Sequence, residues 1–131
     1  MDAAQALADL TEISSQIQAA VVIDADGSAL ASTLDGPRSA ELAGAAQELL
    51  AAAGRVSGEG GRKPAQLEVS TGDGCVFVVQ DADRTIAATT GPEPTVGLVF
   101  YDLKSCLRAF GDEEKPKPRP RKQKEQSDAA A

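Results

Sequence analysis

The chain has 131 residues, a length that fits one domain, and a formal net charge of −7. It contains no histidine, which removes the commonest general base and metal ligand and excludes Ser-His and Cys-His nucleophile pairs. No apolar stretch approaches the roughly 18 residues of a membrane-spanning helix, and the N-terminus lacks a signal-peptide pattern, so we expect a cytoplasmic protein.

The charge is distributed unevenly along the chain. Residues 115 to 131 hold six bases and two acids, a net charge of +4, which leaves −11 for residues 1 to 114. This negative charge argues against nucleic acid as a ligand of the folded part of the chain, because nucleic acid is itself negatively charged. Cys75 and Cys106 are too few and too far apart for a disulfide framework, and we expect two buried, reduced thiols.

The N-terminal third predicts a helix followed by a β-hairpin. Asp2 can cap a helix that runs to about Ile17, because its apolar residues recur with a 3.6-residue period. The β-branched run Ala20–Ile23 is typical of a strand buried on both faces. Asp26-Gly27 then turns the chain into a weaker strand over Ser28–Ser32.

A second helix is predicted from Arg38 to Arg55, with Pro37 in its first turn. This helix has two apolar faces. The face expected to cover the sheet holds Leu42, Ala45, Ala46, Leu49, Ala53 and Val56. The neighbouring face holds Ala43, Leu50 and Gly54, interrupted by Gln47, and its small residues would let another helix approach closely. The alternative is that alanine is simply a good helix former at exposed positions.

The rest of the chain predicts a three-stranded meander and a last helix. Residues 57–64 are rich in glycine but lack the phosphate-loop pattern, so we interpret them as a flexible connector. The expected elements are strands over 65–71, 75–80 and 84–90, then a helix capped by Thr95 that ends at Phe110 before Gly111.

Residues 112–131 are polar and rich in proline, so we expect a disordered or polyproline-like tail after a folded domain over 1–111. One interpretation is a solubilising tail that binds nothing. The other is weak docking on an anionic surface, either lipid or an acidic partner. The bases available for docking are Lys115, Lys117, Arg119, Arg121, Lys122 and Lys124.

No group of residues in the sequence suggests catalysis. Asp24 and Asp26 resemble the start of a calcium loop, but the other ligands are missing, and an ordinary turn explains them. Tyr101, Asp102 and Lys104 are polar neighbours on the last helix, and Asp102 and Lys104 are two positions apart and do not face one another. We therefore expect no metal, no cofactor and no enzyme activity.

The ordered set of elements resembles the roadblock (dynein light chain) domain family. The hairpin sequence VVIDADG followed by ALAS carries much of the likeness, together with an alanine-rich second helix and the strand VFVV. The matching residues are Leu7, Leu10 and Ile13 in the first helix, Val21 to Asp24, Gly27, and Leu30 to Ser32. Gln18-Ala19 departs from the family, in which a glycine often leads into the first strand.

The resemblance implies an α+β fold with three layers, α/β/α, of the roadblock/profilin-like kind. Its five-stranded antiparallel sheet has the order 2-1-5-4-3, with one helix on one face and two on the other. It also implies homodimers in which the third strands pair edge to edge and the second helices pack antiparallel. Here the candidate interface residues are Ala43, Gln47, Leu50 and Gly54 on the helix and Gln66, Leu67, Glu68, Val69 and Ser70 on the strand.

Bacterial members of this family commonly act with small Ras-like GTPases, so the resemblance implies a non-catalytic regulator or scaffold of such a protein. Two alternatives stay open. One is a structural adaptor without a GTPase. The other is a profilin-like small-molecule sensor, against which the small alanine and valine side chains count because they should close a ligand cavity.

Overall fold

The computed structural model describes residues 2–57 and 66–114, so most of the predicted connector and the basic tail lie outside the described residues. These described residues form eight helices and strands. In chain order they are α1 (Ala3–Ile13), β1 (Ile17–Ile23), β2 (Ala29–Ser32), α2 (Gly36–Ser57), β3 (Gln66–Ser70), β4 (Cys75–Asp81), β5 (Arg84–Thr90) and α3 (Val96–Glu114).

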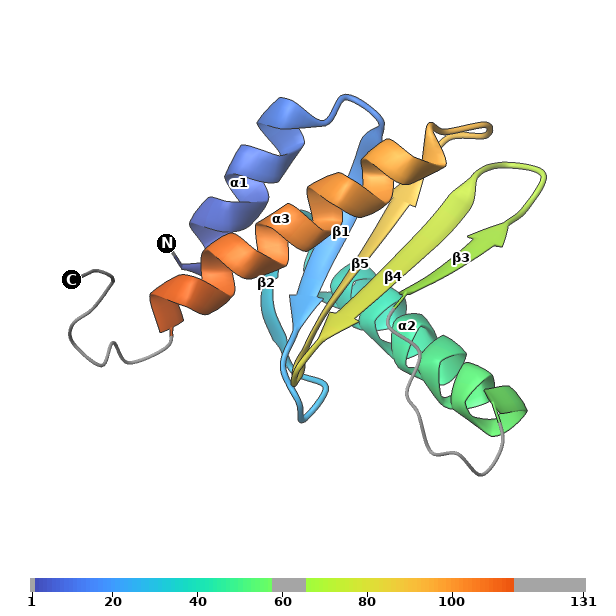
Figure 1. Cartoon of the computed structure of the whole chain (residues 1–131), viewed down its shortest axis with the longest axis horizontal. Helices are drawn as coiled ribbons and strands as arrows, with labels where there is room; N and C mark the ends of the chain where they lie inside the picture. The colour runs from blue at the N-terminus through green and yellow to red at the C-terminus, as the bar shows by residue number, and fades with distance from the viewer. Residues whose placement is uncertain (1, 58–65, 115–131) are drawn as a thin grey trace, which may run out of the picture.

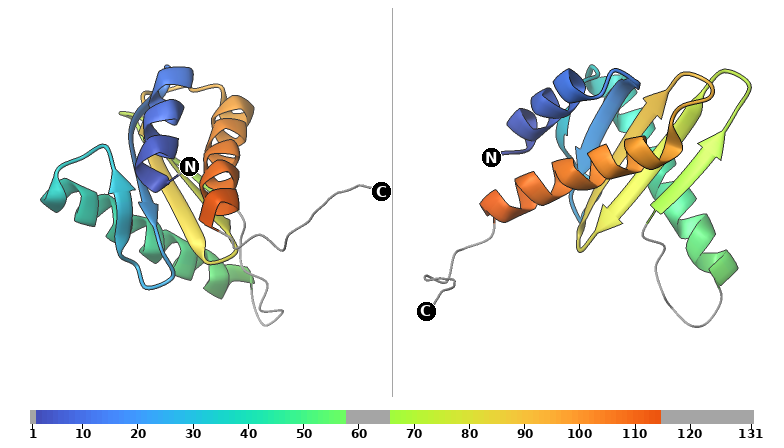
Figure 2. Two further views of the ribbon diagram at one scale, coloured as in Figure 1. Left: turned by 90° about the vertical axis from the view of Figure 1, so that its left-hand side faces the viewer. Right: turned by 45° about the horizontal axis from the view of Figure 1, so that its top comes forward.

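The five strands form one antiparallel sheet in the order β2-β1-β5-β4-β3. Helices α1 and α3 lie side by side on one face, and α2 crosses the opposite face (Figure 1). Figure 2 shows the three layers from two further directions. The predicted fold class and strand order are confirmed.

The three central strands are buried because helices cover them from both sides. Ile86, Ala87 and Ala88 of β5 are all fully buried, although successive side chains point to opposite faces of the sheet. β1 is likewise buried from Ala19 to Ile23. A continuous apolar run instead of an alternating one is what such a position requires.

The larger part of the core lies between the sheet and the pair α1 and α3. Phe77 of β4 is fully buried there and meets Phe100 of α3 edge to face, with ring centroids 5.0 Å apart. At the far end of α3 the guanidinium of Arg84 lies 4.6 Å from the ring centroid of Phe110. These contacts join α3 to the β4–β5 half of the sheet.

The smaller part of the core lies under α2. Ala43 and Ala46 pack against fully buried side chains of the sheet, Val21, Val78 and Ala87 among them. α2 packs chiefly on β1, β2 and β5, so the β3–β4 side of this face receives less cover.

Two aspartates hydrogen-bond to the backbone where a helix begins and where the chain turns, as the sequence predicts. Asp2 caps α1 by accepting from the backbone N–H of Gln5, at 2.9 Å. Asp24 accepts from the backbone N–H groups of Asp26 and Ser28, at 2.9 and 3.0 Å, in a turn where Gly27 has φ +91°. The interpretation of Asp24 and Asp26 as turn residues is confirmed.

Two predicted helix ends are wrong. α1 ends at Ile13, and Ile17 instead opens β1, where it pairs with Thr90 and is buried. Strand pairing and burial outweigh its place in the helical pattern. α3 runs through Gly111 to Glu114, since a single glycine costs a helix about 1 kcal/mol relative to alanine without ending it.

The turn between β3 and β4 provides a matched pair of glycines. A Cβ on Gly74 would collide with the backbone oxygen of Thr90, whereas a Cβ on Gly72 would meet nothing within 4 Å. We expect Gly74→Ala to lower the free energy of unfolding by about 1–3 kcal/mol. To relieve the collision, the backbone at Gly74 or at Thr90 would have to move, and each is held by the pairing of its strand or turn. Urea denaturation measures this loss, and Gly72→Ala is the control. Equal losses in the two variants would contradict the packing described for Gly74.

Candidate functional site

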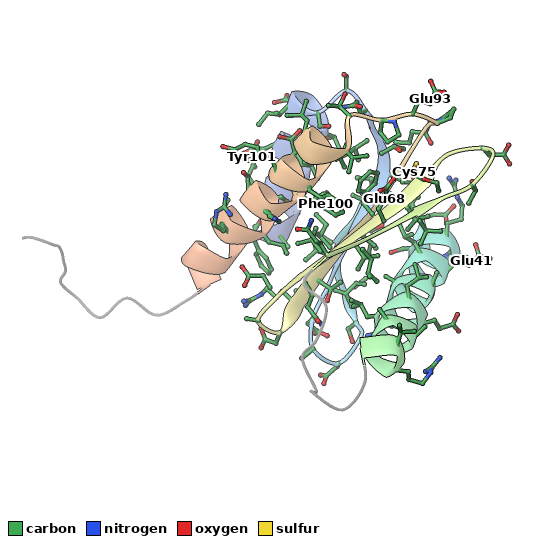
Figure 3. All side chains as sticks on the ribbon, turned by 45° about the vertical axis from the view of Figure 1, so that its right-hand side comes forward. Glu41, Glu68, Cys75, Glu93, Phe100 and Tyr101 are labelled. Carbon is green, nitrogen blue, oxygen red and sulfur yellow. The ribbon has the colours of Figure 1, made fainter. Side chains whose placement is uncertain are left out.

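β3 lies at one edge of the sheet, and no strand pairs with its outer side in the described part of the chain. Gln66, Glu68 and Ser70 are exposed. They lie on the face of α1 and α3, opposite Val79, Phe77 and Cys75 of β4 (Figure 3). Leu67 and Val69 lie on the α2 face. An edge strand presents a row of unpaired backbone groups that another strand can meet.

The structure corrects the predicted assignment of the two faces of α2. Ala43 is buried against the sheet and Leu50 packs on the same cluster, so both belong to the face that covers the sheet. The side-chain amide of Gln47 fills the space beside Gly27, and Gly54 is half-buried with open space where a Cβ would lie.

The most exposed apolar side of α2 is therefore a different one from that predicted. Ala45 is exposed and Val56 is 87% exposed, while Leu42 and Leu49 are half-buried and pack against the same core as Leu50. These positions are spaced three, four and seven residues apart, so they lie on one stripe of the helix. Glu41 and Glu48, on the neighbouring outer side, are solvent-exposed, and Figure 3 shows Glu41 pointing away from the sheet.

Apolar side chains of the sheet continue this stripe. Leu67 and Val76 are half-buried beside the α2 core, and Val69 is 36% exposed. We call the set Leu42, Ala45, Leu49, Val56, Leu67, Val69 and Val76 the α2/β3 surface. It borders the open edge of β3, so an apolar face and unpaired backbone groups lie together.

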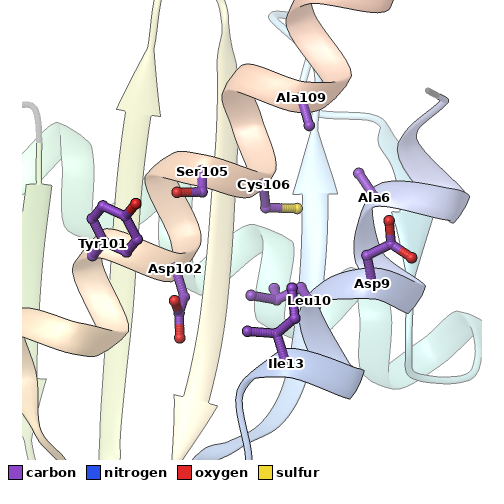
Figure 4. Close-up of a pocket in the computed structure, with 9 residues that line it drawn as sticks. All are labelled: Ala6, Asp9, Leu10, Ile13, Tyr101, Asp102, Ser105, Cys106 and Ala109. Atoms are coloured by element: carbon purple, nitrogen blue, oxygen red, sulfur yellow. The ribbon is translucent and has the colours of Figure 1, made fainter.

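A second candidate surface is a groove of about 340 Å³ between α1 and α3. Leu10 and Ile13 contribute from α1 and Tyr101 from α3, and Ile13 and Tyr101 are 74% and 62% exposed (Figure 4). The complete lining is Ala6, Asp9, Leu10, Ile13, Tyr101, Asp102, Ser105, Cys106 and Ala109. The groove is therefore an apolar trough with acidic groups.

The groove contains a thiol, Cys106, whose pKa is raised. Burial raises the pKa of the Cys106 thiol to about 11, and the nearby charge of Asp9 adds to this rise. Asp102 is buried on the α3 side, while Asp9 accepts from the side-chain amide of Gln5 at 3.0 Å. A thiol held protonated in this way is a poor nucleophile at neutral pH.

Sequence reasoning considered Tyr101 and Asp102 but did not find the groove. The available signal was the position of Asp102 on the buried side of α3, between Val99 and Leu103, where an acid is unusual. A groove between two helices depends on the distance and angle between them, and neither follows from periodicity. The predicted docking bases of the tail, Lys115 to Lys124, lie outside the described residues.

Within residues 2–57 and 66–114 the structure places no three His, Cys, Asp or Glu side chains where they could hold a metal ion together. Among the helices of the same ranges, none has the length and apolarity needed to cross a membrane.

The raised pKa predicts slow alkylation of Cys106. In the Cys75→Ser background, the rate with iodoacetamide should keep rising about tenfold per pH unit from pH 7 to 9.5, because the thiolate remains a small fraction below pH 11. Asp9→Asn should increase the rate, because it removes the carboxylate that disfavours the thiolate. A plateau near pH 8.5 would show an ordinary thiol and contradict the assignment.

Comparisons with known proteins agree with this architecture. A Roadblock/LC7 domain from Streptomyces avermitilis superposes with a TM-score of 0.76 at 17% identity, covering 86% of this chain and 98% of that one. The gliding protein MglB from Thermus thermophilus gives 0.68 at 18% identity, with 86% and 90% covered. An MglB structure with a tetrameric arrangement gives 0.68 at 17% identity, with 84% and 85% covered.

A search of curated protein sequences finds no match. The family model of the Roadblock/LC7 domain matches residues 4–90, which extend from α1 to the end of β5. This match spans more than half of the chain and includes every strand of the sheet. The chain belongs to the Roadblock/LC7 domain family.

Proposed function

We propose that this chain is a non-catalytic, dimeric regulator or scaffold of a small Ras-like GTPase. Membership of the family and the similarity to MglB support a role of the GTPase-regulator kind. The homodimer and the GTPase partner are the specific parts of the proposal. A structural adaptor that uses the same dimer without a GTPase is the second candidate.

The observation that carries the dimer is the incomplete cover of one sheet face. On one face, α1 and α3 pack on β2, β1, β5 and β4. On the other face, α2 runs obliquely across the strands and packs chiefly on β1, β2 and β5, so the β3–β4 side receives less cover (Figure 1). Leu67, Val69 and Val76 of the α2/β3 surface stay partly exposed there.

A second copy related by a two-fold axis would cover both the open edge of β3 and the α2/β3 surface. Its β3 would pair with the open edge of β3, and its α2 would lie against the α2/β3 surface. The interface therefore uses the predicted strand Gln66–Ser70. On the helix it uses the outer stripe of Leu42, Ala45, Leu49 and Val56 instead of the predicted Ala43, Gln47, Leu50 and Gly54, which lie on another side of α2, Ala43 and Leu50 against the sheet of their own protomer.

The chain offers little means of acting on nucleotide by itself, since it has no histidine and no phosphate loop. A dimer would instead present a surface formed by both copies, on which one GTPase could dock. Stimulation of hydrolysis would then come from favouring one conformation of the GTPase switch loops. An arginine finger is the competing mechanism, because Arg38 and Arg55 lie near the two ends of α2 and are at least partly accessible, while Arg62 lies outside the described residues.

Ala45→Arg tests the dimer without disturbing the protomer, because Ala45 is exposed in the described fold. In the dimer it would place a large charged group in a desolvated interface, which is strongly unfavourable. Light scattering should report a dimer for the unchanged chain and a monomer for Ala45→Arg at micromolar concentration. Ala8→Arg, at an exposed position of α1, is the matched control and should remain dimeric. An unchanged chain that is monomeric would remove the proposal.

The GTPase proposal predicts nucleotide-dependent association with the Ras-like GTPase encoded nearest to this chain. Pull-down should recover more of that GTPase when it carries a non-hydrolysable GTP analogue than when it carries GDP. Failure to recover it in either state, with the dimer intact, would favour the structural adaptor.

If hydrolysis is stimulated, alanine at Arg38, Arg55 and Arg62 separates the two mechanisms. Loss of an arginine finger should reduce the stimulated rate by about 10³-fold or more. We expect a change of less than about tenfold, as selection of a switch-loop conformation requires. A single-turnover hydrolysis assay measures the rate, and Arg108→Ala on the opposite face is the control.

A further inference from the structure

We propose that the chain's own basic segment after α3, Lys115 to Lys124, docks in the groove between α1 and α3. This proposal does not depend on the dimer or on a GTPase. The acidic surface that this segment binds is then the groove of its own domain.

The groove has the chemistry that a basic, proline-rich segment needs. Its apolar floor, with Leu10 and Ile13 on one side and Tyr101 on the other, can contact proline rings (Figure 4). Asp9 and Asp102 supply negative charge along the same trough. Two bases of α3, Lys104 and Arg108, are exposed on the Tyr101 side of the groove, and the guanidinium of Arg108 approaches Ser105 at 3.4 Å. The attraction for a basic segment is therefore concentrated around Asp9 and Asp102.

The segment matches the groove in charge and in backbone preference. It holds six bases, and Pro116, Pro118 and Pro120 alternate with three of them. A residue before proline avoids the helical region, so the segment favours an extended, polyproline-like course. An extended chain of this kind loses little conformational entropy on docking.

The segment also starts close enough to reach the whole groove. Twelve residues of α3 separate Asp102 from Glu114, a distance of about 18 Å along the helix. Ten residues in a polyproline conformation span about 31 Å. After a reversal of a few residues at Glu114, the segment can therefore run back along α3 past Ala109 and Cys106 to Asp102.

Because the basic segment is attached to the domain that carries the groove, a weak affinity is sufficient for it to be docked most of the time. A short flexible connection gives an effective concentration in the millimolar range, so a segment that binds in trans with a Kd below about 1 mM would be mostly docked in cis. Exposed ion pairs supply part of this affinity and are screened by salt. While docked, the six bases are less available to lipid or to other acidic partners.

Tyr101 provides a direct test, because it is the single tyrosine of a chain without tryptophan. Acrylamide should quench its fluorescence less in the unchanged chain than in a full-length variant with the six bases replaced by glutamine. The difference should vanish when salt is raised from about 0.05 to 1 M, because the Debye length falls to about 3 Å. Equal quenching of the two chains at low salt would overturn the proposal.

A synthetic peptide of residues 115–131, titrated into the glutamine variant, measures the affinity. It should protect Tyr101 with a Kd below about 1 mM, and a value weaker than about 10 mM would overturn docking in cis. Asp9→Asn should weaken peptide binding about twofold to fivefold, the effect of one exposed ion pair. Glu41→Gln, on the opposite side of the molecule, is the control and should leave the Kd unchanged.

Two further outcomes exclude other occupants. Protection of Tyr101 that grows with protein concentration would mean that the groove receives the segment of a second copy, and would overturn docking in cis. Phosphatidylserine vesicles should bind the unchanged chain more weakly than they bind the free peptide. Equal binding would show that the bases are not held by the groove, and would also overturn the proposal.

Discussion

The fold depends on one constraint: a five-stranded sheet whose central strands are apolar on both faces has to be covered on both sides. Val21, Val22 and Ile23 are all fully buried, and so are Ile86, Ala87 and Ala88. Only helices packed on each face can keep such strands from water. The distribution of three helices between two faces then decides which surfaces the protomer leaves open.

Two helices on one face and one on the other produce two different kinds of open surface. On the face of α1 and α3 the helices pack on β2, β1, β5 and β4, and a trough stays open between the two helices. On the face of α2 the helix reaches only part of the sheet, and apolar side chains of β3 and β4 stay half-exposed. The first surface suits an extended segment, and the second suits another helix.

Much of this arrangement could be predicted from the sequence, because alternation, continuous apolar runs and turn residues are local signals. The strands, the hairpin at Asp24 to Gly27 and the order of elements are confirmed. Ile17 was misassigned because an apolar residue fits a helical stripe and a buried strand equally well. Its pairing with Thr90 decides between them.

The faces of α2 and the groove could not be predicted, for a different reason. Ala43 and Leu50 have the same periodicity as their neighbours, and only the angle at which α2 crosses the sheet determines which residues it buries. The groove likewise depends on how α1 and α3 lie side by side. Such relations arise between elements, and alanine-rich helices carry few large side chains that could indicate them.

Hydrogen exchange at the two edge strands tests the central claim, that the β3 edge and the incompletely covered face meet a second copy. In the described part of the protomer both β2 and β3 have an open outer side. The account predicts that amides of β3 become protected as protein concentration rises through the dimerisation range, whereas those of β2 do not. Equal exchange at β2 and β3 in a sample whose mass is that of a dimer would contradict it.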